Sequence, residues 1–158
     1  MNNRQLVSCL WFEKDAEAAV NLYVSVFKDS KIVNIIRYGK EGQEVHGQKE
    51  GEVFTVEFTI KGQQFVAFNG NGGSRFNEAV SFQILCDNQD EIDYYWNRLT
   101  SDGGQESQCG WLKDRYGLSW QVVPAILPML LSDPSRRDRV MHAFMKMKKF
   151  DIAALESA

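Results

Sequence analysis

The sequence is poor in the residues that build disulfide scaffolds and metal sites. Its 158 residues include only three cysteines and two histidines, and no two cysteines form a CxxC pair. Cys9 and Cys86 lie in strand-like runs, where buried thiols behave as small apolar groups. An odd set of unpaired cysteines indicates reduced thiols, so we expect a cytoplasmic protein.

The sequence also lacks long hydrophobic runs and a strong charge of either sign. No apolar run approaches the roughly 20 residues of a membrane helix, and the start, MNNRQLVSCLWFEKD, has no small-residue cleavage site for a signal peptide. The net charge of −3 provides no electrostatic reason to expect nucleic acid or an anionic membrane as a partner. With 44% apolar residues, the chain has the composition of a globular protein.

What is present is a pattern that occurs twice. The stretch VSCLWFEKDAEAAVNLY aligns without gaps with VSFQILCDNQDEIDYYW, which pairs Asp15 with Asn88 and Tyr23 with Trp96. Asp15 and Asn88 each follow a strand-like run and are typical helix N-caps. The glycine-rich run GNGGS separates the two copies. The alignment predicts two βαβββ units in tandem, and the alternative is a chance match between two strand–helix pairs.

The remaining patterns complete each unit. The polar, glycine-rich segment 39–51 is typical of a mobile loop. A last helix is expected with Ser132 or Asp133 as its cap and Pro134 in its first turn. Its apolar side is expected to cover the main domain or a partner subunit: Val140, Met141, Phe144 and Met145. The expected strands lie at 6–12, 31–38, 53–60, 64–69 and 80–86, and a final hairpin lies within CGWLKDRYGLSWQVVP at 109–124.

Two such units, the second ending in GxxWQxxP, resemble the vicinal-oxygen-chelate superfamily, which includes glyoxalase I, bleomycin-resistance proteins and extradiol dioxygenases. LWFEKDAEAAVNLYVSVF, GQQFVAFNGN and CGWLKDRYGLSWQVVP are most similar to the PhnB-like branch, often labelled 3-demethylubiquinone-9 3-methyltransferase. The resemblance implies an α+β fold whose strands form a cup around a small molecule, and a homodimer. It implies one glyoxalase-like domain over 1–158, with units at 5–70 and 78–124 and a helical extension at 125–158.

Metal-using relatives hold a divalent ion with histidines and glutamates on the cup strands. The corresponding positions here are Ser8, Ser81, Gln121 and either Asn69 or Ala67. None of them carries an imidazole or a carboxylate, and His46 and His142 lie in the polar loop and the last helix. We therefore expect no metal and no cofactor. Gln121 keeps the shape of a glutamate and its hydrogen-bonding ability without the charge.

Strand alternation predicts which residues line the cup. If Gln121 faces the cup, Trp120 and Val122 face the covering helices. The expected ligand-binding residues are Ser8, Asn69, Ser81, Gln83, Trp111 and Gln121. Two alternatives stay open: the polar side chains bond one another or water in a narrow barrel, and Trp111 belongs to the core.

Two further side chains are candidates for catalysis. Cys109 would need a positive charge to favour its thiolate, and Lys113 and Arg115 are its possible neighbours. Glu57 alternates with apolar residues in VFTVEFTI and would serve as an acid or base if burial favoured its protonated form. The alternatives are an unreactive thiol and a solvated carboxylate.

Three functions are compatible with these residues. The first is a metal-independent, cytoplasmic small-molecule-binding protein, similar to bleomycin-resistance relatives. The second is an enzyme on a small organic substrate that uses Cys109 or Glu57. The third is an interaction module that uses the methionine-rich last helix. Methyl transfer from S-adenosylmethionine is not supported, because LVSCLWFEKDAEA lacks the glycine-rich turn that typically follows a first strand, and GNGGS follows a hairpin strand instead.

Overall fold

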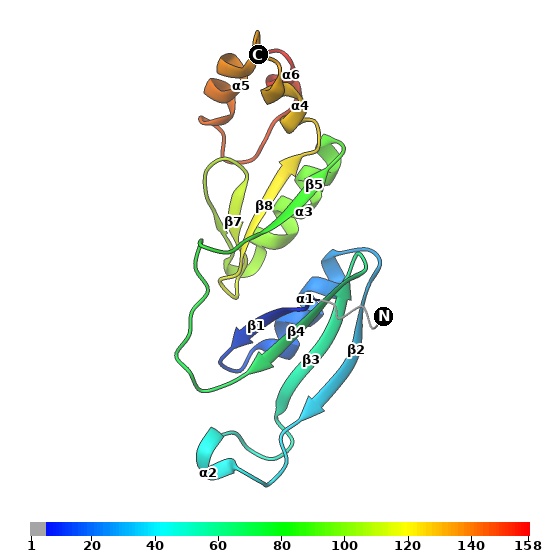
Figure 1. The fold of residues 1–158 in the computed structure, drawn as a ribbon, viewed down its shortest axis with the longest axis vertical. Helices are drawn as coiled ribbons and strands as arrows, with labels where there is room; N and C mark the ends of the chain where they lie inside the picture. Colours follow the sequence, from blue (N-terminus) through cyan, green and yellow to red (C-terminus); the bar gives the residue numbers. More distant parts are fainter. Residues whose placement is uncertain (1–5) are drawn as a thin grey trace. The chain divides into compact units, whose positions relative to one another are not determined.

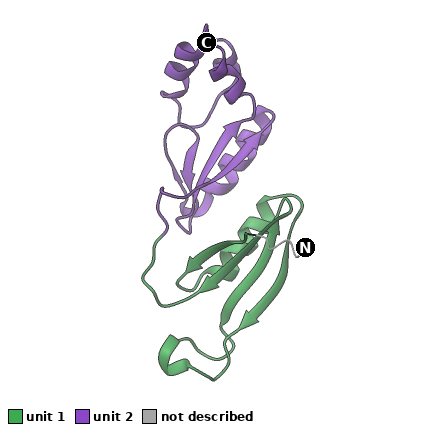
Figure 2. Ribbon diagram, viewed as in Figure 1, with its two compact units in different colours: residues 1–75 green, residues 76–158 purple. Residues whose placement is uncertain are grey.

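The structure, a computed structural model, describes residues 6–158 as two compact units (Figures 1 and 2). Unit 1 comprises residues 1–75 and unit 2 comprises residues 76–158. Each unit contains a four-stranded mixed sheet and one long helix. The expected α+β fold of two βαβββ units with C-terminal helices is confirmed. The expected start of the first unit, residue 5, lies outside the described residues.

Unit 1 has the strand order β1-β4-β3-β2, in which β1 and β4 are parallel and the other pairs are antiparallel. The helix α1 covers one face of the sheet, and its Tyr23 ring stacks on Phe58 with 6.3 Å between the ring centroids. The elements of this unit are β1 (Ser8–Phe12), α1 (Ala16–Val26), β2 (Ser30–Arg37), α2 (Gln43–His46), β3 (Val53–Ile60) and β4 (Gln63–Asn69).

Unit 2 repeats this topology with the strand order β5-β8-β7-β6, in which β5 and β8 are parallel. Its helix α3 begins at the expected cap, because the Asn88 side chain accepts a hydrogen bond from the Glu91 amide at 3.0 Å. The apolar side of α3 buries Ile92, Trp96 and Leu99. The elements are β5 (Phe82–Cys86), α3 (Gln89–Thr100), the 3-10 turn η1 (Ser101–Gly103), β6 (Gln105–Glu106), β7 (Trp111–Lys113) and β8 (Ser119–Pro124).

The two units differ by one residue in the connection between the first strand and the helix. Three residues separate β1 from α1, and two separate β5 from α3. The helices align as the sequence predicts, with Asp15 and Asn88 at their caps. The strands align one residue further along, which pairs the buried Leu10 with the buried Ile84. Since strand side chains alternate, this shift exchanges the two faces of β1 relative to the prediction.

The segment 39–51, whose composition is typical of a mobile loop, includes some regular structure. It contains the single helical turn α2, and both Gly42 and Gly47 have positive φ angles at its ends. The side chain of Asn71 donates to the His46 carbonyl and accepts from Gln48 Nε2 at 2.7 Å. These hydrogen bonds tie the segment to the chain that follows β4, so its polar residues make contacts within unit 1.

Three short helices follow β8: α4 (Leu127–Ser132), α5 (Arg137–Phe144) and α6 (Ile152–Glu156). The predicted apolar side of the last part is only partly covered, because Val140 is buried while Met141 and Met145 are exposed. No helix within residues 6–158 is both long enough and apolar enough to cross a membrane.

The C-terminal segment is anchored at the turn before β7. The backbone amides of Cys109 and Gly110 donate to the carbonyls of Met147 and Lys148, each at 2.7 Å. Gly110 has a φ of +79°, and a Cβ atom there would lie 2.4 Å from the Phe150 ring. Both the backbone conformation and this close approach require glycine.

We therefore predict that Gly110→Ala lowers the free energy of unfolding by about 3 kcal/mol, because it adds overpacking to backbone strain. Gly117 is the matched control: its φ is +86°, but nothing lies within 4 Å of the position of a Cβ atom. Gly117→Ala should cost only the strain, about 1–2 kcal/mol. Urea unfolding measures both variants. An equal loss in the two would show that the Phe150 contact is unimportant.

Candidate functional site

The open face of the unit 2 sheet, which α3 leaves uncovered, carries a row of neutral polar side chains. Gln83 of β5, Gln121 of β8 and Trp111 of β7 are register partners across three adjacent strands. Gln121 Nε2 donates to Ser81 Oγ at 2.8 Å, and Gln83 Nε2 donates to Gln121 Oε1 at 3.4 Å. Four of the six predicted ligand-binding residues therefore lie together, and we call Ser81, Gln83 and Gln121 the amide row.

Alternation along β8 places the amide row on this face. Trp120 and Val122, on either side of Gln121, are buried on the helix-covered face, as the sequence predicts. The Trp120 indole donates to Asp114 Oδ2 at 2.9 Å, so its polar atom is satisfied within the core. Because Trp120 points inward, Gln121 points outward.

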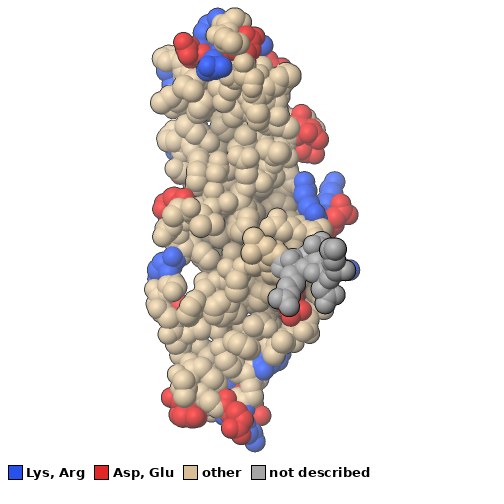
Figure 3. Space-filling model, in the orientation of Figure 1, with Lys and Arg blue, Asp and Glu red and all other residues tan. Residues whose placement is uncertain are grey.

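The amide row can offer a ligand both donors and acceptors without a charge. Its internal hydrogen bonds leave Gln83 Oε1 and the hydroxyl hydrogen of Ser81 available to a ligand. Leu85 lies on the same face and is exposed, which adds apolar surface. In the view of Figure 3, charged side chains of unit 2 gather around the C-terminal helices and the margins, and the middle of the unit is uncharged.

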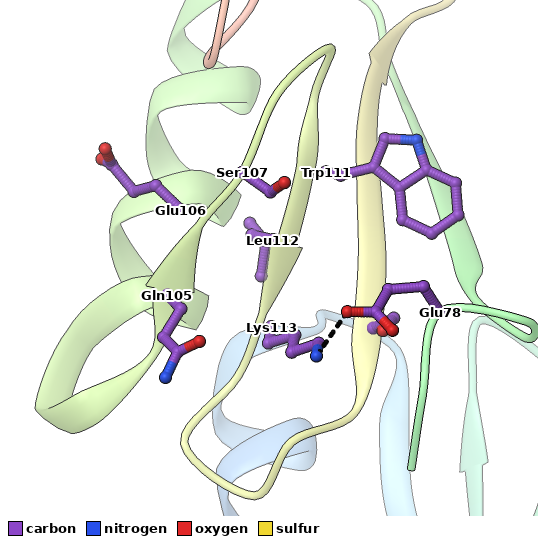
Figure 4. Close-up of a pocket in the computed structure, with 8 residues that line it drawn as sticks. Glu78, Gln105, Glu106, Ser107, Trp111, Leu112 and Lys113 are labelled. Carbon is purple, nitrogen blue, oxygen red and sulfur yellow. Dashed lines mark ion pairs between the residues drawn. The ribbon is translucent and has the colours of Figure 1, made fainter.

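A cavity of about 450 Å³ lies next to Trp111 within unit 2 (Figure 4). Side chains of β6 and β7 line it, together with Glu78, which forms an ion pair with Lys113. The hydrogen bond from Lys113 is the main cause that holds the pKa of Glu78 below its ordinary value. Strand alternation places Lys113 on the same face as Trp111 and could have identified it. Glu78 lies in an irregular segment, for which no sequence pattern predicts a direction.

Ser8 and Asn69, the other two predicted ligand-binding residues, lie on the helix-covered face of the unit 1 sheet. Ser8 shares its face with the buried Leu10 because strand side chains alternate, and the one-residue shift in β1 makes this the helix-covered face. Asn69 is 5% exposed; its Oδ1 accepts from the Ala16 amide at 2.9 Å and its Nδ2 donates to the Val53 carbonyl at 3.0 Å. The prediction that Ser8 and Asn69 face the open side is wrong. Asn69 instead joins β4 to the first turn of α1 and the start of β3.

We predict that Asn69→Ala lowers the free energy of unfolding by about 2–4 kcal/mol, because it leaves a buried amide and a buried carbonyl without partners. Asn97, an exposed residue of α3, is the control, and Asn97→Ala should change stability by less than about 0.5 kcal/mol. Chemical unfolding followed by circular dichroism measures both. A loss below 1 kcal/mol for Asn69→Ala would contradict the structural role.

Metal coordination is tested by the donor atoms at the equivalent strand positions. In unit 1, the strand alignment and the pairing of the parallel strands place Val7 and Val66 where unit 2 has Ser81 and Gln121. Within residues 6–158, no three His, Cys, Asp or Glu side chains are grouped as metal ligands. None of these four side chains offers the imidazole or carboxylate that a divalent cation prefers.

Cys109, the first candidate for catalysis, makes its polar contacts with the C-terminal segment. Its Sγ lies 3.7 Å from the Phe144 carbonyl oxygen. Lys113 and Arg115, the cations expected to favour a thiolate, are each paired with a carboxylate. The geometry therefore connects Cys109 with the anchoring of the C-terminal segment.

Glu57, the second candidate, lies on the open face of the unit 1 sheet, where Val66 of β4 is its register partner. It borders a cavity of about 220 Å³ that is also lined by Val7 and Val33. A single carboxylate thus lies beside apolar side chains. Cys109 belongs to the other unit, so the two candidates share no site within a unit.

The chain matches the family described as 3-demethylubiquinone-9 3-methyltransferase over residues 4–123. No curated protein matches it. Among solved structures, a PhnB protein from Bacillus cereus, itself described as a 3-demethylubiquinone-9 3-methyltransferase, is 34% identical with a TM-score of 0.69. The match covers 77% of this chain and 100% of that one.

Two more distant structures show the same fold. A protein from Pseudomonas aeruginosa is 16% identical, with a TM-score of 0.64 over 77% of this chain and 98% of its own. The fosfomycin resistance protein FosX from Mesorhizobium loti is 16% identical, with a TM-score of 0.56 over 84% of this chain and 100% of its own. The predicted resemblance to the PhnB-like branch and to the vicinal-oxygen-chelate fold is confirmed.

Proposed function

The chain belongs to the 3-demethylubiquinone-9 3-methyltransferase family, and from this premise we propose that it is a metal-independent protein that binds a small organic molecule on the open face of unit 2. The amide row is the observation that carries the proposal. An amide-and-hydroxyl set beside an indole and a leucine is the mixture of few polar groups and apolar walls that small-molecule sites use.

The neutral character of the row supports binding without a metal. Gln121 and Ser81 satisfy each other through a 2.8 Å hydrogen bond, which a cation between them would have to break. Neither side chain carries a charge to offset that loss. A neutral polar group of a ligand can instead accept from the Ser81 hydroxyl or donate to Gln83 Oε1.

Two glycines of the GNGGS run serve packing. Gly70 and Gly72 lie against the indole of Trp11, and a Cβ atom on Gly72 would come within 2.4 Å of that ring. Trp11 Nε1 donates to the Gly70 carbonyl at 3.0 Å. These contacts give Gly70 and Gly72 a packing role, so the two glycines provide no support for methyl transfer.

Native mass spectrometry of gently purified protein tests the proposal. We expect a homodimer with the additional mass of a bound organic molecule and no stoichiometric metal. Gln121→Leu should remove most of that mass, because it replaces the centre of the amide row with an apolar group. Gln63→Leu, at an exposed position at the start of β4, should retain it. Retention of the mass by Gln121→Leu would contradict the site, and a stoichiometric divalent ion would contradict metal independence.

Added metal provides an independent test. We expect excess Mn²⁺ to raise the melting temperature by less than about 1 °C, because a ligand that does not bind the native state adds no stabilisation. Differential scanning calorimetry measures this with and without the chelator EDTA. A saturable increase of several degrees, reversed by the chelator, would show a specific metal site.

A further inference from the structure

We propose that the cavity beside Trp111 binds the aromatic, negatively charged part of the ligand. Lys113 is the counter-ion of the ligand, and the Glu78 carboxylate competes with the ligand for Lys113. The inference rests on the proposed function, since Trp111 borders both the amide row and the cavity. It goes beyond that function because it specifies the chemical class of the ligand.

The size and walls of the cavity suit a flat ring system. Its volume of about 450 Å³ lies within the range of small-molecule pockets. Trp111 supplies a partly exposed indole surface for stacking. The neutral polar groups of the wall are the Gln105 amide and the hydroxyls of Ser107 and Ser119. Lys113 ends in the same cavity, and Figure 4 shows its ammonium group directed toward Glu78.

The two members of the ion pair differ in their access to water. The side chain of Lys113 is 33% exposed, and that of Glu78 is 62% exposed. Glu78 can therefore turn into solvent and remain hydrated, whereas Lys113 would keep a partly desolvated charge. The pair itself contributes little to stability at such exposure. A ligand anion that also stacks on Trp111 can thus replace the Glu78 carboxylate as the partner of Lys113.

A second carboxylate at the cavity, Glu106, does not reverse this preference for an anion. Glu106 Oε1 accepts from the Trp96 indole at 2.9 Å, and its Oε2 lies 3.7 Å from Lys148 Nζ. In Figure 4 its carboxylate points away from Lys113. The Glu106 carboxylate is therefore paired outside the cavity. Once Glu78 turns away, the cavity presents the positive charge of Lys113.

Binding of a matched pair of probes tests the inference. 2-Naphthoate and its neutral analogue 2-naphthamide share the same ring system, and both are titrated into the full chain. The indole N–H signal of Trp111 reports binding in a nitrogen-15 NMR spectrum and is assigned with Trp111→Phe. We expect 2-naphthoate to bind about tenfold more tightly than 2-naphthamide, because a charge-assisted hydrogen bond exceeds a neutral one. Equal affinities, or tighter binding of the cation 2-naphthylmethylamine, would overturn the inference without any substitution.

Substitutions identify the charges responsible. Lys113→Met keeps most of the apolar stem and should reduce the affinity for 2-naphthoate to that for 2-naphthamide. Glu78→Gln removes the competitor and should increase the affinity for 2-naphthoate about threefold or more, while the affinity for 2-naphthamide stays constant. Lys149→Met is the control, because Lys149 pairs with Asp93 and does not line the cavity. An unchanged preference for the anion in Lys113→Met would overturn the assignment of Lys113.

The outcome separates this inference from the proposed function. If the native chain carries an organic mass that depends on Gln121 but shows no preference for 2-naphthoate, the amide row stands and the anionic ligand class is wrong. If 2-naphthoate binds through Lys113 and Gln121→Leu retains the native mass, the charged cavity stands and the amide row is not the site. If neither a bound mass that depends on Gln121 nor a preference for 2-naphthoate is observed, the proposed function and this inference are both wrong.

Discussion

The candidate site depends on the hydrogen bonds that the buried carboxylate of Asp114 accepts. This carboxylate accepts two backbone amides within the β7–β8 turn, at 2.9 and 3.1 Å, and the indole of Trp120 at 2.9 Å. A carboxylate removed from water is tolerated only when donors surround it in this way. The same bonds close the hairpin and hold Trp120 against α3, so Gln121 faces outward. The hairpin register then places Trp111 beside Gln121.

The two units share a topology, but their open faces differ in chemistry. In unit 1, Trp11 and Phe68 lie on this face with 4.9 Å between their ring centroids, and Val66 occupies the position of Gln121. The polar groups of unit 2 are therefore not a property of the fold. They arise from particular residues on β5 and β8, and the same scaffold carries different groups in each copy. For this reason the proposed recognition through neutral hydrogen bonds concerns unit 2.

Much of the site in unit 2 was predictable from local patterns. Alternation along β8 assigns Trp120 to the core and Gln121 to the open face, and the cap at Asn88 locates the start of α3. The same reasoning failed in β1, where counting back from the helix cap ignores one additional residue in the connection. The ion pair between Glu78 and Lys113 was not predictable, because it joins an irregular segment to a strand that lies far along the chain.

The order of strands and helices, the tandem repeat and the absence of charge at Gln121 follow from residues close together in the chain. Periodicity and helix caps are local, so they can be recognised without a structure. Three features depend on pairings between distant strands: the face that β1 presents, the support of α1 by Asn69 and the cavity beside Trp111. Those pairings are selected by the burial of whole sheet faces under α1 and α3, and a difference of one residue in a connection reverses which side chains are buried.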